Sequence, residues 1–150
     1  MQVALVACGK AHTVVYTNSG KLFAFGSNAE GQLGVGRTPE FSDVPVELPA
    51  ADVIREGVAK LAAGSAHSMA LGKETGEESL LVRQESNFKE VNDAVPGQIY
   101  VWGSNTDGQL GLGPDTEEMM FTPALLRLPS GLDSSVFIRD IRCIQLNIYW

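Results

Sequence analysis

The chain has 150 residues, of which 44% are hydrophobic and 19% charged, and its formal net charge is −7. This length and composition predict one globular domain with a real core and argue against a disordered chain. The acidic balance and the scatter of the 11 basic residues argue against binding to nucleic acid, and no apolar run is long enough for membrane insertion.

Two cysteines, Cys8 and Cys143, are too few for a disulfide framework and indicate reduced thiols in an intracellular protein. The first residues, "MQVALVACGKAHT", lack the basic segment of a signal peptide. We therefore expect a cytoplasmic protein, with the nucleus as the alternative.

Taken in chain order, the first predicted elements belong to a repeated unit. "VACGKAHTVVYT" at 6–17 corresponds to "LAAGSAHSMALG" at 61–72, which aligns Gly9 and His12 with Gly64 and His67. "GKLFAFGSNAEGQLGVG" at 20–36 corresponds to "GQIYVWGSNTDGQLGLG" at 97–113. A third copy begins at 136–143 but has Ile144 in the place of the glycine and Asn147 in that of the histidine. Internal repeats of this kind are typical of propellers and solenoids.

Each unit contains short runs rich in β-branched and aromatic residues, which predict strands at 12–17, 21–26 and 98–103. "NSG" at 18–20 predicts a tight hairpin turn, and both faces of "KLFAF" and "QIYVW" are apolar, which predicts strands covered on both sides. Proline-marked segments follow at 44–49 and 122–129. A two-layer sandwich is the alternative, but it does not explain the repeat.

The fold class predicted is therefore all-β: an incomplete β-propeller with two four-stranded blade-type repeats and the start of a third. The single partial propeller domain, 1–150, divides into repeat 1 at about 3–52, repeat 2 at about 53–132 and a stub at 133–150. Repeat 2 carries an insert at 73–96, either a loop that contacts a partner or, as we favour, extra sequence at a tolerant turn. Retained non-coding sequence would explain both the insert and the broken third copy.

The glycine runs at 26–36 and 103–113 resemble a phosphate loop only superficially. Gln32 and Leu33 stand where a P-loop needs Lys and Ser or Thr, and the dinucleotide spacing also fails. Asn28, Gly31, Asn105 and Gly108 suit tight turns with left-handed residues, and Leu33 and Leu110 are expected to wedge between adjacent blades. The structural repeat positions in the runs are Gly26, Asn28, Gly31, Leu33, Gly34 and Gly36, then Gly103, Asn105, Gly108, Leu110, Gly111 and Gly113.

His12 and His67 are the candidate metal ligands or bases, but each lies in an apolar context without a ligand cluster. We expect buried histidines bonded to backbone carbonyls. Asp115, Glu117 and Glu118 are expected to form a solvated loop tip rather than an acid–base pair. The sequence thus predicts no catalytic residue, no cofactor and no metal.

The twin Gly-x-x-His and Gly-Ser-Asn-x-x-Gly-Gln-Leu-Gly-x-Gly motifs resemble the repeat of the regulator of chromosome condensation family. The resemblance covers roughly 3–71 and 97–143 and implies a seven-bladed propeller with roles in GTPase regulation and scaffolding. It implies protein partners such as a small GTPase or its effectors and, through the GTPase-regulator members, a cilium or basal body.

Three functions remain open at this stage: a non-catalytic interaction and scaffold module, a guanine-nucleotide exchange factor for a small GTPase, and a truncated product without independent activity. Two repeats and a stub leave apolar faces and strand edges uncovered, so the remaining blades or self-association are expected to be needed.

Overall fold

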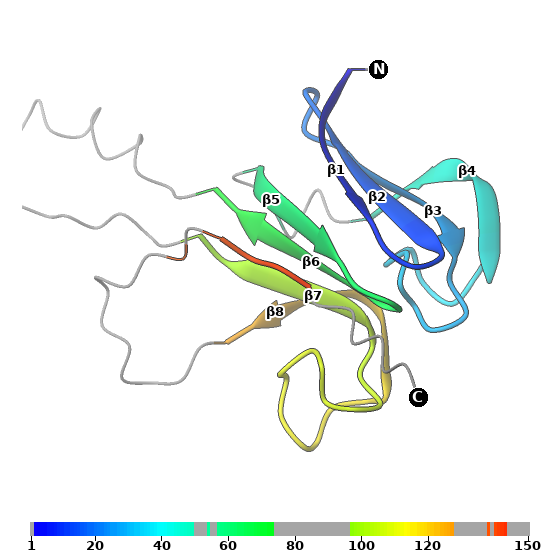
Figure 1. Ribbon diagram of the computed structural model, residues 1–150, viewed down its shortest axis with the longest axis vertical. Helices are drawn as coiled ribbons and strands as arrows, with labels where there is room; N and C mark the ends of the chain where they lie inside the picture. The colour runs from blue at the N-terminus through cyan, green and yellow to red at the C-terminus, as the bar shows by residue number, and fades with distance from the viewer. Residues whose placement is uncertain are drawn as a thin grey trace, which may run out of the picture.

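The computed structural model describes residues 2–49, 54, 57–73, 97–127, 138 and 140–143. Over these residues it is an all-β structure of eight strands in two four-stranded antiparallel sheets. The sheet orders are β1-β2-β3-β4 and β5-β6-β7-β8, so within each sheet every strand pairs with its neighbours in sequence. Each sheet is therefore one meander, and the two meanders pack beside each other like successive propeller blades (Figure 1).

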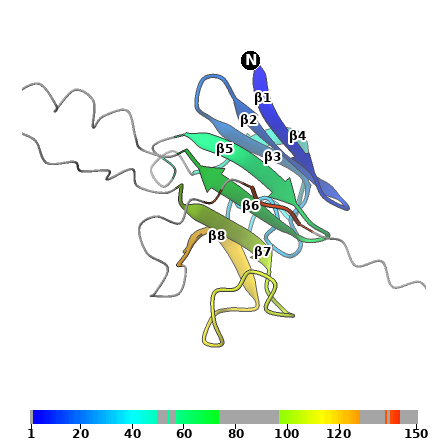
Figure 2. The ribbon, with the colours of Figure 1, turned by 60° about the vertical axis from the view of Figure 1, so that its left-hand side comes forward.

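The strand bounds follow the apolar runs of the sequence. Blade 1 consists of β1 (Val3–Cys8), β2 (His12–Thr17), β3 (Leu22–Ser27) and β4 (Phe41–Glu47). Blade 2 consists of β5 (Val58–Ala63), β6 (His67–Gly72), β7 (Ile99–Ser104) and β8 (Met119–Leu126). Figure 2 shows the two sheets from a second side, with β5 of blade 2 next to blade 1.

Successive side chains of β2 and β3 point to opposite faces of the sheet, and only one of these faces contacts blade 2. Val14, Tyr16, Leu22 and Ala24 belong to the cluster between the sheets, and the residues between them in sequence project from the opposite face because successive strand side chains alternate. That opposite face is the outer face of blade 1. In β7, by contrast, all six residues are buried, as the apolar character of both its faces predicts.

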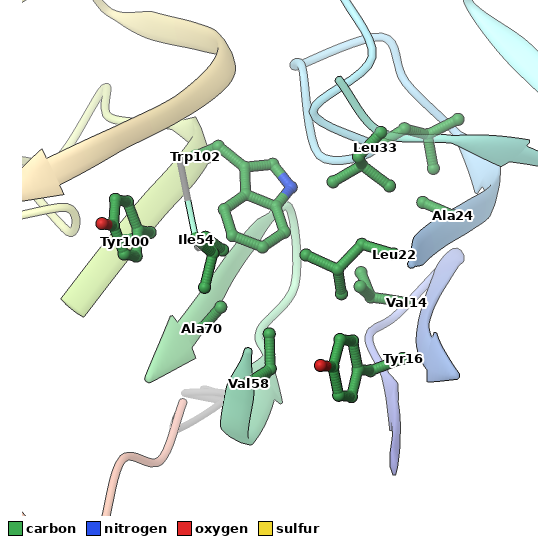
Figure 3. Packing of buried hydrophobic residues seen from close by; sticks show 11 residues of the cluster. Val14, Tyr16, Leu22, Ala24, Leu33, Ile54, Val58, Ala70, Tyr100 and Trp102 are labelled. Carbon is green, nitrogen blue, oxygen red and sulfur yellow. The ribbon is translucent and has the colours of Figure 1, made fainter. Parts of the chain in front are cut away.

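The main core is the seam between the two blades. Blade 2 contributes Ile54, Val58, Ala70, Tyr100 and Trp102. In Figure 3 these side chains face Leu22, Leu33 and Val14 of blade 1 across the seam. A second cluster lies on the other face of blade 2 and includes Ile141 of the third repeat.

Parts of the predicted repeat units lie outside the described residues. This applies to 74–96 of the insert and to 128–137 and 144–150 around the stub. The interpretation of the insert as extra sequence at a tolerant turn therefore stays a prediction.

The glycine runs form turns, but one detail of their prediction is wrong. All positive φ angles of the described residues belong to glycines, such as Gly20 at 82° and Gly31 at 79°, so Asn28 and Asn105 are not left-handed. Asn28 is instead a buried side-chain bridge: its Nδ2 donates to Gly36 O at 2.9 Å and Pro39 O at 2.8 Å. Its Oδ1 accepts from Leu33 N at 3.1 Å. The asparagine is needed for its amide rather than for its backbone freedom.

The Gly-x-x-His motif is a steric pairing within each hairpin. Gly9 N donates to His12 O at 2.8 Å, and Gly64 N donates to His67 O at 2.9 Å, which closes each turn. A Cβ at Gly9 would overlap the His12 ring and the carbonyl oxygen of Gly64, and a Cβ at Gly64 would overlap the His67 ring. The spacing in the motif therefore reflects a ring that lies directly over a glycine.

We predict that Gly9→Ala lowers the free energy of unfolding by about 1–3 kcal/mol, since the added methyl must displace a buried ring. Gly72→Ala is the matched control, because its Cβ would lie 3.5 Å from its nearest neighbour, an ordinary contact. Urea denaturation followed by circular dichroism measures both. Equal stabilities for the two variants would contradict the steric explanation.

Candidate functional site

The polar residues of the repeat motif meet at one buried point of the seam between the blades. Gln32, in the glycine run of blade 1, presents its backbone carbonyl to blade 2. Ser68 Oγ on β6 donates to this carbonyl at 3.0 Å, and Trp102 Nε1 on β7 donates to it at 3.0 Å. His12 Nε2 on β2 lies 2.8 Å from Ser68 Oγ. We call these four residues the seam network.

The turn that carries Gln32 fits closely against blade 2. A Cβ at Gly34 would lie 2.8 Å from Trp102 Cδ1, and one at Gly31 would lie 2.8 Å from the carbonyl oxygen of Met120. Leu33, between them, is fully buried in the main core. Leu33 thus occupies the wedge position predicted for it, and the flanking glycines allow the turn to approach the neighbouring blade.

Further contacts extend the seam on either side of the network. Lys10 N donates to Gly64 O at 3.3 Å, and Gly36 N donates to Phe121 O at 2.8 Å. The Arg37 guanidinium lies 4.5 Å from the centroid of the Phe121 ring, a cation–π contact.

The hydrogen-bond directions define the protonation state of His12. The single hydroxyl hydrogen of Ser68 is donated to Gln32 O, so Ser68 Oγ must accept from His12, and Nε2 carries the proton. Nδ1 is then the unprotonated nitrogen, and within the described residues it is buried and has no partner. The sequence predicts a backbone carbonyl as partner for this histidine, but the hydrogen-bond partner found is the Ser68 hydroxyl, because Ser68 fills the space opposite the ring.

Burial, with a smaller contribution from the charge of His67, lowers the pKa of His12 from 6.5 to about 4. Burial also lowers the pKa of His67. Both histidines are therefore neutral at pH 7.

The pair His12 and Ser68 superficially resembles a base and a nucleophile, but its geometry excludes that role. Ser68 is 0% exposed, and the nitrogen that faces it is the protonated one, so it has no lone pair to accept the serine proton. The network binds one blade to the next and does no chemistry on a substrate.

The second copy of the motif lies in a different environment. Leu110 is buried in the second cluster together with Ile141, and the Asn105 amide again bridges its loop, accepting from Leu110 N at 3.2 Å and donating to Glu117 O at 3.3 Å. Gln109, by contrast, is exposed where Gln32 is buried. A Cβ at Gly108 or Gly113 meets nothing within 4 Å, and one at Gly111 meets only Leu126 at 3.6 Å.

The remaining candidates are placed as follows. Asp115, Glu117 and Glu118 are exposed on the loop before β8; Glu117 forms a long ion pair of 3.9 Å with Arg37. Across the residues that the structure describes, no group of three His, Cys, Asp or Glu side chains could hold a metal ion. Within the same part of the chain, no helix is long and apolar enough to cross a membrane.

Sequence reasoning missed Ser68, Trp102 and Gln32 as members of one network. A signal was present, because a hydroxyl residue follows the histidine in both copies, as Thr13 and Ser68, and an aromatic residue precedes the first glycine in both, as Phe25 and Trp102.

Two sequential meanders joined by a buried seam define the chain as part of a repeat-built β-propeller. It belongs to the regulator of chromosome condensation family: two models of the regulator of chromosome condensation (RCC1) repeat match it, one at 19–71 and 96–143 and the other at 3–32.

Relatives with this repeat have varied names. The chain is 34% identical over 111 residues to the X-linked retinitis pigmentosa GTPase regulator of Canis lupus familiaris, covering 74% of this chain and 9% of that protein. It is 33% identical over 113 residues to the probable E3 ubiquitin-protein ligase HERC6 of Homo sapiens, covering 75% of this chain and 9% of that protein. The chain therefore spans about a tenth of these relatives, namely part of their RCC1-type region.

Among solved structures, human WBSCR16 matches with a TM-score of 0.60 and 23% identity, covering 84% of this chain and 25% of that one. A likeness at this identity supports the fold of the two blades alone.

We predict that Trp102→Phe destabilises the protein by about 1–2 kcal/mol, because it removes a buried hydrogen bond to Gln32 O and leaves a small gap. The control is Phe25→Leu at the equivalent position of the outer face, where we expect a smaller loss. Thermal or urea unfolding measures both, and a Trp102→Phe protein as stable as the parent would contradict the role given to the indole N–H.

We also predict acid sensitivity from His12. Its pKa is 6.5 when unfolded and about 4 in the fold, so its contribution to stability is complete above pH 6.5 and is lost as the pH falls from 6.5 towards 4. The expected loss is on the order of 2–3 kcal/mol. His12→Gln keeps an N–H donor for Ser68 and should remove this part of the pH dependence. Urea unfolding of both proteins at pH 7 and pH 4.5 gives the comparison; identical pH profiles would contradict it.

Proposed function

We propose that this chain is a non-catalytic protein-interaction and scaffold module of an RCC1-type propeller. The observation that supports it best is the complete burial of Ser68, which commits the most reactive-looking pair, His12 and Ser68, to the seam. The polar motif residues that could carry chemistry therefore build the fold, and function is left to the surface of the blades.

The outer strand of blade 1 offers a surface suited to a protein partner. Phe41 is 65% exposed and Val44 60% exposed on β4, and the acidic residues Glu40, Asp43 and Glu47 are exposed around them. Exposed apolar side chains within a polar rim are typical of protein interfaces. We propose that β4 contacts a partner with apolar and basic side chains, either a small GTPase or one of its effectors, as the name of the retinitis pigmentosa relative suggests.

A second candidate is guanine-nucleotide exchange on a small GTPase. It is favoured by a relative in Bos taurus named secretion-regulating guanine nucleotide exchange factor, 28% identical over 144 residues and covering 70% of this chain and 30% of that protein. For either function we propose a cytoplasmic location, with the cilium, the basal body or the nucleus as sites to examine by tagged expression.

The test is binding of the full chain to a panel of purified small GTPases, each prepared nucleotide-free, with GDP and with a non-hydrolysable GTP analogue. We expect a binding partner whose affinity falls at least tenfold with Phe41→Asp, since a charge would enter an apolar contact. The control is Leu125→Asp, an exposed apolar residue on β8, which should leave binding unchanged.

Release of a fluorescent GDP analogue separates the two candidates. An interaction module leaves the release rate unchanged, whereas an exchange factor accelerates it. Absence of binding to every GTPase and nucleotide state, or equal binding by Phe41→Asp, would contradict the proposed interaction.

A further inference from the structure

Three segments of the chain correspond as the first strand of a repeat, and they differ in burial. Val3 and Val6 of β1 align with Val58 and Leu61 of β5 and with Ile138 and Ile141 of the third repeat. Val58 is 2% exposed and Ile141 9%, whereas Val3 is 53% and Val6 59% exposed. Within the described residues, Val58 and Ile141 are thus covered by the blade that precedes them in sequence, whereas Val3 and Val6 are exposed.

At the seam, two complementary faces meet, one from each blade. Blade 1 presents a wedge face, defined by Val14, Tyr16, Leu22, Ala24 and Leu33; blade 2 receives it with a socket face, defined by Val58, Leu61, Ser68, Ala70 and Trp102. The repeat gives each blade one face of each kind.

Two further faces correspond to these by the sequence repeat. The wedge face of blade 2 consists of Met69, Leu71, Ile99, Val101 and Leu110. The socket face of blade 1 consists of Val3, Val6, Thr13, Val15 and Phe25.

The described residues 138 and 140–143, called the segment 138–143 below, cover part of the wedge face of blade 2. Ile138, Ile141 and Cys143 pack against its cluster, and the red segment runs lengthwise beside β6 and β7 in Figure 1. Asp140 lies 2.8 Å from Lys60 Nζ of β5 and 3.2 Å from Arg142 Nε. This segment therefore takes, on blade 2, the position that β5 takes on blade 1.

We infer that the segment 138–143 is an intramolecular cap that competes with β1 of a second copy of this chain. When the cap leaves, the wedge face of blade 2 accepts the socket face of blade 1 of the second copy, head to tail. Such a contact joins two different surfaces, so it can repeat from copy to copy.

The wedge face of blade 2 and the socket face of blade 1 offer the same kinds of groups that meet at the seam. A groove of about 340 Å³ lies beside Gly111, lined by Leu112, Met120 and Leu125 among others, where the equivalent place beside Gly34 holds Trp102. Phe25 of a second copy supplies the aromatic ring for this groove. Its Thr13 supplies a hydroxyl for the backbone carbonyl of Gln109, an exposed residue, as Ser68 does for Gln32.

The experiment measures the mass of the full chain by sedimentation velocity over a concentration series. We expect the parent to remain a monomer at low micromolar concentration and Ile141→Asp, which expels the cap, to form dimers and larger oligomers. Adding Val6→Asp to Ile141→Asp should restore the monomer. Val44→Asp is the matched control, since Val44 is 60% exposed like Val6 but lies outside the socket face; added to Ile141→Asp, it should leave the oligomers intact.

Lys60→Glu is a second way to release the segment 138–143, because the new carboxylate repels Asp140 without changing either apolar face. In this variant, association should begin at a severalfold lower protein concentration than in the parent. Near-ultraviolet circular dichroism establishes that each variant is folded. A folded Lys60→Glu protein that associates no more than the parent would overturn the inference, as would oligomers that Val6→Asp and Val44→Asp weaken equally.

Discussion

The described structure depends on one buried carbonyl. Gln32 O lies inside the seam between two sheets, where an unpaired acceptor would be costly, and it receives hydrogen bonds from Ser68 and Trp102. Satisfying it requires the turn of blade 1, β6 and β7 to come together at once. His12 completes the arrangement by donating to Ser68, so this histidine contacts the neighbouring blade in addition to Gly9 of its own hairpin.

The two copies of the motif show that position in the propeller decides what a residue experiences. Gln32 is buried and Gln109 exposed, although the surrounding sequences are nearly identical. Gly31 touches the backbone of Met120, while Gly108 faces open space. Within the described residues these differences have one origin, because blade 1 packs against the four strands of blade 2, whereas the far face of blade 2 is contacted by Ile138, Ile141 and Cys143.

The residues of the family motif serve the packing of the blades and do not by themselves determine a particular function. The residues that mark the chain as a member of the regulator of chromosome condensation family stabilise the fold, and relatives that are about a third identical to the chain have names as different as a GTPase regulator and a probable ubiquitin ligase. Specific function must come from residues that the repeat leaves free. In the described part of this chain those are the exposed side chains of β4, the loops and the uncovered β1.

The sequence alone was enough to predict the repeat, the all-β class, the strands around 12–17 and 98–103 and the wedge role of Leu33. Periodicity and glycine spacing are local patterns, and each of them occurs in both repeats. The tertiary structure alone decided that Ser68 is the partner of His12 and that Asn28 bridges its loop through its amide. His12 and Ser68 are 56 positions apart in the sequence, and the Asn28 bridge depends on the geometry of its side chain. A pattern in one strand shows that a residue is buried, but only the packing of two blades shows what it is buried against.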